Sequence, residues 1–275
     1  MFEIKEPLRL SSMGSYPTGG GGNSISLQNG LAYVMGLAGL SILNLDFETG
    51  ISRLGHVGNL TTSSMAVVAG STAFVADKNK GLVCIDVSDP GSPSEVDRYE
   101  PSISYAKEVV IRQNYAFVTS IGSQGHQIAS IDISNLQLPV KRGGYTIGGN
   151  GGVKGMDIDG SNLYLATNIG AEIVSLNNPQ DPSPIGMFPL SGKTVWAIQA
   201  RGGMAYIYRE PRDNAPSSNM LEVFNISDPS APLILGSLGF GGNYIALNFC
   251  LHNDLAVFPD MNSPSLRLVS IANPG

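Results

Sequence analysis

Two short segments of this chain combine a lysine with an acidic residue in a way that could support chemistry. Lys107 is followed directly by Glu108, and Lys154 precedes Asp157 by three residues. In a site shielded from water, burial and a neighbouring charge shift the pKa of such groups. Either member could then act as a general acid, a general base or an anchor for an anion. The alternative is that the charges pair with one another and fill the space between strands.

Other side chains suit proton transfer or ligand binding. Tyr105 and Tyr208 complete the set of catalytic candidates, because a phenol can also give or take a proton. Trp196 is the only tryptophan, and its ring could either stack on a ligand or be buried in the core. Together with other aromatic and polar residues it forms the set expected to bind a ligand: Trp196, Tyr208, Arg209, His126, Asn243 and Tyr244.

The remaining chemistry-bearing residues indicate neither a metal site nor redox chemistry. His56, His126 and His252 fall in different parts of separate repeats, so we expect no histidine-based metal site and no cofactor. The chain has no Gly-x-Ser-x-Gly segment of the kind that carries a hydrolase serine. Cys84 and Cys250 fall on strands of distant repeats, so we expect two buried free thiols and no disulfide.

The elements that must position these side chains belong to a block that recurs six times, every 41 to 51 residues. In its clearest copy, residues 71–93, a short apolar strand, a turn, a second apolar strand and an Asp-Pro pair follow one another. The other copies open with LAYVMG, YAFVTS, LYLATN, MAYIYR and LAVFPD. A period of about 45 residues built from short strands is typical of a β-propeller with one repeat per blade.

Each repeat divides into four strands, which in the second repeat we expect at residues 65–69, 72–76, 82–87 and 95–99. Glycine and amide residues make a tight turn after the first strand, and proline ends the third because it lacks an N–H donor. We therefore predict an all-β fold in a single domain, residues 1–275, with six blades of four antiparallel strands. The blades are expected at about residues 23–58, 62–100, 105–146, 153–190, 194–238 and 243–275.

The sixth repeat stops just where its outer strand should begin. Residues 7–14, PLRLSSMG, match residues 232–239, PLILGSLG, which form the expected outer strand of the fifth blade. We therefore predict that residues from about 7 to 16 supply the outer strand of the sixth blade and close the ring. A closed ring leaves no unpaired blade edge.

The two apolar strands of residues 73–93, with their Ala-Phe-Val and Gly-Leu-Val-x-Ile-Asp-Val-Ser-Asp-Pro patterns, resemble the LVIVD-repeat propeller family. The resemblance is strong there and at residues 220–232, and it extends more weakly over nearly the whole chain. It implies a propeller fold and often a bacterial or archaeal surface setting. No catalytic motif comes with it, so it assigns no site residue.

In a propeller, the connections between blades and the loops after each second strand meet on one face around the axis, which is the default binding site. These loops are unequal here: residues 120–126, 259–262 and, longest and most charged, 208–216. Such insertions either carry binding or merely lie over the surface. A second ring is expected where the chain enters each inner strand, at Asn23, Ser64, Lys107, Lys154, Trp196 and Leu247.

Composition narrows the class of partner. The net charge is −6, and only 16 Lys and Arg are present, scattered singly, so we expect no nucleic-acid partner. No stretch reaches the roughly 20 apolar residues of a membrane-spanning helix, so we expect no membrane insertion. The first residues, MFEIKEPLRL, lack the pattern of a signal peptide. The compartment stays open: the cytoplasm, or the outside of the cell after removal of a leader.

Three functional classes remain open at this point. The chain could be a binding module that presents a central pocket and the long fifth-blade loop to a small molecule, a glycan or a protein. It could be a cofactor-independent cyclase, isomerase, lyase or hydrolase that uses the acid–base residues at the mouth. It could also be a scaffold that works through its rim. The unequal loops favour the binding module.

Overall fold

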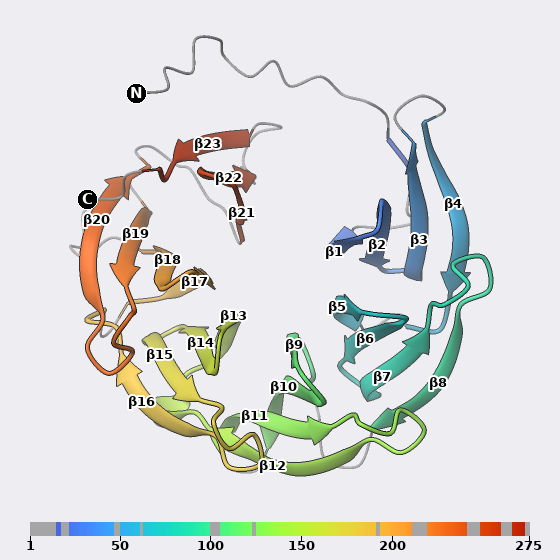
Figure 1. Cartoon of the computed structure of the whole chain (residues 1–275), viewed down its shortest axis with the longest axis horizontal. Coiled ribbons are helices and arrows are strands. Elements are labelled where there is room, and N and C mark those ends of the chain that lie inside the picture. Colours follow the sequence, from blue (N-terminus) through green and yellow to red (C-terminus); the bar gives the residue numbers. More distant parts are fainter. Residues whose placement is uncertain are drawn as a thin grey trace.

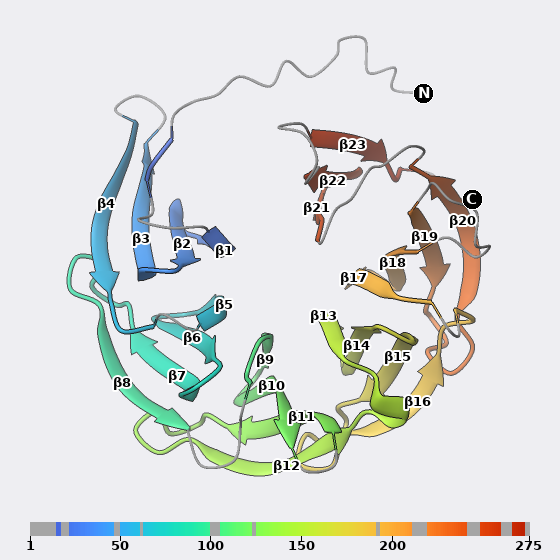
Figure 2. The same ribbon diagram turned by 180° about the vertical axis from the view of Figure 1, so that it is seen from behind.

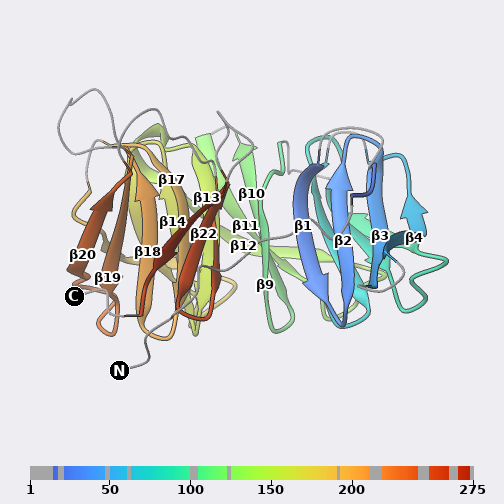
Figure 3. The same ribbon diagram turned by 90° about the horizontal axis from the view of Figure 1, so that it is seen from above.

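The computed structural model is a ring of six antiparallel β-sheets, which confirms the predicted six-bladed propeller (Figure 1). Inner strands surround the centre and outer strands form the rim, and the opposite face shows the same order (Figure 2). Seen from the side, the strands run between two faces that carry the loops (Figure 3). The structure describes residues 15–17, 22–46, 50–60, 63–99, 105–122, 125–190, 193–210, 219–240, 248–259 and 266–272.

The first three blades each contain four strands in consecutive order from axis to rim. Blade 1 is built from β1 (Gly22–Gln28), β2 (Leu31–Gly36), β3 (Gly39–Asp46) and β4 (Gly50–Val57). Blade 2 is built from β5 (Ser63–Ala69), β6 (Thr72–Asp77), β7 (Gly81–Asp86) and β8 (Ser94–Tyr99). Blade 3 is built from β9 (Val109–Arg112), β10 (Tyr115–Gly122), β11 (Gly125–Asp132) and β12 (Val140–Thr146).

The other blades follow the same order. A 3-10 turn, η1 (Gly148–Asn150), leads into blade 4, which consists of β13 (Val153–Asp159), β14 (Asn162–Thr167), β15 (Gly170–Ser175) and β16 (Ser183–Met187). Blade 5 consists of β17 (Val195–Arg201), β18 (Met204–Arg209), β19 (Met220–Asn225) and β20 (Leu233–Gly239). Among the described residues, blade 6 has three strands, namely β21 (Cys250–His252), β22 (Leu255–Pro259) and β23 (Leu266–Ser270).

The hydrophobic core lies between blades rather than within one of them. In blades 2 to 5 both faces of the middle strands are covered by a neighbouring sheet, which is why these strands read as continuous apolar runs. Between blades 4 and 5, for example, Ile173 and Phe188 pack with Ile198 and Phe224. Similar clusters of buried residues join blades 1 and 2, 2 and 3, 3 and 4, and 5 and 6.

Glycines on the outer strands allow consecutive blades to approach closely. A Cβ atom on Gly186 of β16 would collide with the backbone carbonyl of Pro229, which belongs to the next blade. Gly55 of β4 meets the carbonyl of Pro90 in the same way, and Gly143 of β12 meets that of Gln180. The Asp-Pro turn of one repeat therefore packs on a glycine of the repeat before it.

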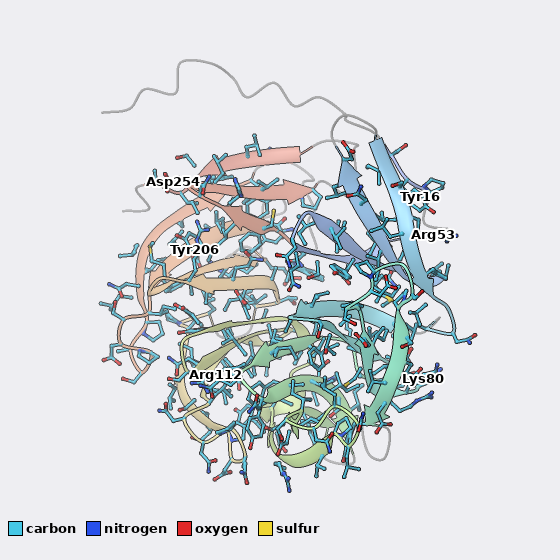
Figure 4. All side chains as sticks on the ribbon, turned by 45° about the vertical axis from the view of Figure 1, so that its right-hand side comes forward. Tyr16, Arg53, Lys80, Arg112, Tyr206 and Asp254 are labelled. Carbon is cyan, nitrogen blue, oxygen red and sulfur yellow. The ribbon has the colours of Figure 1, made fainter. Side chains whose placement is uncertain are left out.

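A second set of contacts ties the inner strands together. The last residue of several inner strands reaches the tight turn of the next blade. Gln28 donates to the carbonyl of Gly70 at 2.7 Å, and Arg112 donates to that of Gly160 at 2.8 Å. The Arg201 guanidinium donates to the carbonyl of Asn253 in the same way. Arg112 is labelled in Figure 4, where it projects from the green part of the ring.

The seam between blade 6 and blade 1 differs from the other five. Among the described residues, no apolar cluster joins these two blades, and Ile25 and Leu27 of β1 remain 63% and 66% exposed. The predicted closing strand, residues 7–16, lies almost wholly outside the described residues. The structure therefore leaves ring closure as a prediction.

Two local expectations, on Cys250 and on residues 120–126, are wrong. Cys84 is buried, but Cys250 is exposed, because its neighbours Phe249 and Leu251 are the residues that pack into the core between blades 5 and 6. The expected loop 120–126 is mostly strand, since Ile121 pairs with His126 and Gly122 with Gly125.

No described residues form a helix long and apolar enough to cross a membrane.

The expected fifth-blade loop, residues 208–216, also begins later than predicted. Tyr208 and Arg209 belong to β18, where they pair with Leu221 and Met220 of β19. Both side chains are fully buried. Residues 211–218 lie outside the described residues.

Candidate functional site

An extra residue interrupts the ladder at the start of the inner strands. The register between the first and second strands shifts at the same place in blades 1, 2, 4 and 5, at Asn23, Ser64, Lys154 and Trp196. In blade 3 the N–H groups of Lys107 and Glu108 both donate to Thr119 Oγ1, at 3.1 and 2.9 Å. A β-bulge bends the strand and redirects the side chains around it. Four of the six predicted entry residues therefore lie at such irregularities.

A cavity of about 350 Å³ lies among the inner strands around the centre of the ring. This volume falls within the range of small-molecule sites. Its wall combines an apolar surface with a few polar side chains. The apolar part includes Met65, Val67, Val110, Ile111, Met156, Ile158 and Ile198, and the polar part includes Glu108, Lys154, Asp157, Trp196, Gln199 and Asn248.

Glu108 is the carboxylate in this wall with the fewest partners. Its one ion-pair contact is to Lys107 Nζ, 3.5 Å from Oε1, and the lysine is the more exposed of the two. Burial raises the pKa of Glu108, and the charge of Lys107 opposes that shift only in part. Glu108 can therefore exchange hydrogen bonds with a bound molecule, as a donor or as an acceptor.

Asp157 and Gln199, by contrast, hold the ring together. Asp157 accepts the N–H of Ala200 on the next blade at 2.8 Å and the N–H of Ile158 at 2.9 Å. Gln199 donates to the carbonyl of Phe249 at 3.0 Å and accepts the N–H of Leu251 at 3.1 Å. Burial raises the pKa of Asp157, while these backbone donors oppose the shift. Neither side chain has its main polar atoms free for a ligand.

Lys154 and Trp196 occupy equivalent positions on neighbouring blades and contact each other. The Lys154 ammonium lies 5.4 Å from the centroid of the Trp196 ring, which is the geometry of a cation–π contact. Trp196 is half-buried, and part of it packs against the cluster between blades 5 and 6. It thus both packs against the core and forms part of the cavity wall.

The other predicted residues lie elsewhere. Tyr105 is 61% exposed and does not line the cavity. The Tyr208 ring packs against Phe240 and Phe258, and its hydroxyl accepts a hydrogen bond from Asn219 at 2.9 Å. Neither tyrosine reaches the charged groups of the wall.

Arg209 forms a buried ion pair with Glu222 and is not a surface group. Its Nε and one terminal nitrogen contact the two carboxylate oxygens of Glu222, at 2.6 and 2.7 Å. Both side chains are almost completely buried, so each charge compensates the other. The guanidinium also donates to the carbonyl of Glu210.

The histidines stay apart, and no group of histidine, cysteine and acidic residues suited to a metal occurs in the part of the chain that the structure describes. His126 lies at the start of β11 and does not line the cavity. Asn243 and Tyr244, together with Leu247, lie outside the described residues. No statement about their role comes from the structure.

Several wall residues were not predicted from the sequence. Asn248 follows the expected entry residue of the sixth repeat, just as Glu108 follows Lys107, so the alignment of the repeats held the signal for it. Gln199 occupies the position of Asp157 in the next repeat. Position alone did not show that Asp157 and Gln199 bond to the adjacent blade.

The LVIVD repeat matches residues 62–100 and 104–146, which correspond to blades 2 and 3. The chain therefore carries LVIVD repeats within a six-bladed β-propeller. The resemblance stated for these two repeats is thus confirmed. A search of curated proteins found no match to this sequence.

Solved structures share the fold at low sequence identity. The periplasmic gluconolactonase of Pseudomonas aeruginosa superposes with a TM-score of 0.72 at 13% identity, over 91% of the LVIVD-repeat chain and 82% of the other. A protein from Lactobacillus plantarum gives 0.70 at 14%, over 90% and 84%. A chain of the mitotic checkpoint complex gives 0.67 at 14%, over 91% and 76%. At such identities the likeness concerns the fold alone.

Proposed function

We propose that this propeller is a binding module whose ligand is a small molecule held in the axial cavity. The observation that carries the proposal is the position of Glu108 and Trp196 in the wall of a cavity of about 350 Å³. Polar and apolar side chains share this wall, so it can contact both the polar groups and the carbon skeleton of a small molecule. In this proposal the part of the expected fifth-blade segment 208–216 that follows β18 is a further contact surface.

A second candidate is a cofactor-independent enzyme that uses Glu108 as its acid or base. The raised pKa of Glu108 favours it, because a buried carboxyl that titrates nearer to neutral pH transfers protons more effectively. The similarity in fold to a protein described as a gluconolactonase agrees with a hydrolase but does not establish one. Asp157 and Tyr208 are weaker candidates, because their polar atoms are already bonded within the protein.

Protein partners form the third alternative, since a structural neighbour belongs to the mitotic checkpoint complex. Trimming residues 211–217 separates this alternative from the others. Loss of a protein partner with an unchanged small-molecule affinity would place protein binding on the loop and leave the cavity as a separate site.

Trp196 gives a direct test of the main proposal. It is the only tryptophan of the chain and lines the cavity, so its fluorescence should change when the cavity is filled. We expect a saturable change in a screen of metabolite-sized sugars, sugar acids and aromatic acids. Glu108→Gln should weaken binding about tenfold, since a hydrogen bond to a charged group contributes about 1.5 kcal/mol or more.

The matched control is Glu95→Gln, because Glu95 lies on the outer strand β8 and pairs with Arg98 at 2.6 Å. This variant should bind like the wild type. A screen without any change of Trp196 fluorescence, confirmed by calorimetry, would contradict the proposal. Turnover of a ligand that is abolished only in Glu108→Gln would instead establish the enzyme.

A further inference from the structure

We infer that the ligand of the axial cavity is a small organic carboxylate, with its anionic group bound to Lys154 and its carbon skeleton against Trp196. This inference rests on the proposed function and narrows it to one chemical class. It depends on which polar groups of the cavity wall already bond to other atoms of the protein and which do not.

Lys154 is the one cationic side chain in the described wall of the cavity. No carboxylate among the described residues lies within ion-pair distance of it, and its recorded contact is the face of Trp196. An ammonium group carries three N–H donors and no acceptor, so Lys154 requires acceptor atoms from a molecule in the cavity. Water can supply them when the cavity is empty, and a carboxylate supplies them together with a compensating charge.

The carboxylates of the cavity wall do not supply acceptor atoms to the Lys154 ammonium. Asp157 uses both of its oxygens to accept backbone N–H groups of Ala200 and Ile158. Glu108 is associated with Lys107, whose Nζ lies 3.5 Å away. The wall therefore combines an unused cation with acids that already have partners.

The nearby acids also limit the charge of the ligand. Glu108 and Asp157 line the same cavity as Lys154, so a dianion such as a phosphate monoester would meet two acidic groups and a single cation. A monoanion can pair with Lys154 and brings one negative charge fewer than a dianion next to these acids. Phosphate recognition in proteins typically uses several donors or an arginine fork, which the described wall lacks.

The rest of the wall suits the carbon skeleton of such an acid. The Trp196 ring and the side chains of Met65, Met156 and Ile198 provide an apolar surface beside Lys154. Glu108 and Asn248 lie in the same wall and can bond to hydroxyl groups. A ring-shaped carboxylic acid with or without hydroxyl groups meets all of these features.

Calorimetric titration with matched pairs tests the inference. The probes are D-glucuronate against D-glucose, and benzoate against benzyl alcohol, with D-glucose 6-phosphate as the dianion. We expect at least one acid to bind about tenfold more tightly than its neutral counterpart, which corresponds to about 1.4 kcal/mol. Lys154→Met should abolish that difference, and Lys154→Arg should retain most of it.

Lys141→Met is the control, because Lys141 lies on the outer strand β12 and outside the cavity. Its circular dichroism and melting temperature should match those of Lys154→Met, and its preference for the acid should match that of the wild type. Equal binding of an acid and its neutral partner would overturn the carboxylate inference and leave the proposed function intact. Tighter binding of the phosphate would also overturn it. No binding of any probe, with no response of Trp196, would contradict both proposals.

Discussion

Glu108 and Asp157 are both acids on inner strands, but the fold uses them differently. Asp157 bonds to a backbone N–H of the next blade and therefore stabilises a seam. Glu108 lies where β9 begins and has a single, long ion-pair contact to Lys107. Of the two, Glu108 is the residue that can bind a ligand, although the sequence offered both as acid–base candidates.

The raised pKa of Glu108 predicts a pH-dependent stability. Because burial raises this pKa above that of an unfolded chain, the folded protein binds the proton more tightly than the unfolded one. Stability should therefore fall as pH rises from the ordinary glutamate range through the folded-state pKa. Glu108→Gln lacks this titration, so its stability relative to the wild type should increase as the pH rises above the ordinary glutamate range.

Urea unfolding of both proteins across this pH range measures the effect. Glu95→Gln serves as the control and should show no comparable trend, because Glu95 lies on the outer strand β8, where it pairs with Arg98. Parallel pH profiles for Glu108→Gln and the wild type would show that Glu108 is not desolvated as described.

At the scale of the elements, each strand of a blade has a separate task. The inner strands carry the bulges that shape the cavity, and the middle strands form the cores between blades. The outer strands need a glycine where the next repeat's turn comes close. Each repeat of blades 2 to 5 therefore contributes one strand to the cavity wall, two strands to the cores between blades and one strand to the rim.

Gly186→Ala tests the close contact between neighbouring blades at the rim. The new Cβ would meet the backbone carbonyl of Pro229, which cannot rotate away as a side chain could. We expect a loss of about 1–3 kcal/mol of unfolding free energy, the usual cost of overpacking. The measurement is urea unfolding, with Gly148→Ala as the control, because nothing lies within 4 Å of a Cβ built there. A loss in the control equal to that of Gly186→Ala would argue against the clash.

At the scale of the whole molecule, a ring is stable only if all six seams hold. Five seams have buried apolar clusters among the described residues, whereas the β1 face toward blade 6 leaves Ile25 and Leu27 exposed. Polar contacts between blades, such as that from Arg112 to Gly160, add to the seams that are formed. The sixth seam therefore determines the stability of the closed ring.

Deletion of residues 2–15 tests whether the N-terminus completes blade 6. We expect a marked fall in melting temperature, because β23 would lose its outer neighbour and the sixth seam would open. Calorimetry measures the change. Replacing residues 7–14 with PLILGSLG, the sequence of residues 232–239, should retain stability, whereas a Gly-Ser segment of the same length should not. An unchanged melting temperature after the deletion would contradict ring closure by this segment.

The sequence by itself determined the number of repeats, the strand order and the entry position of each inner strand. These features follow from local patterns: short apolar runs, glycine turns and Asp-Pro breaks, which act within a few residues. The aligned entry residues Lys154 and Trp196 were identified in this way, and both line the cavity.

Only the tertiary structure decided which polar groups are already bonded. Arg209 looked like a loop residue but pairs with Glu222 in the core, and Asp157 looked like a free acid but accepts an N–H from the next blade. Cys250 looked buried but is exposed. Each of these outcomes depends on partners brought together from another strand or blade. A polar group's role is set by the atoms that surround it in space, and a local pattern in the sequence does not contain them.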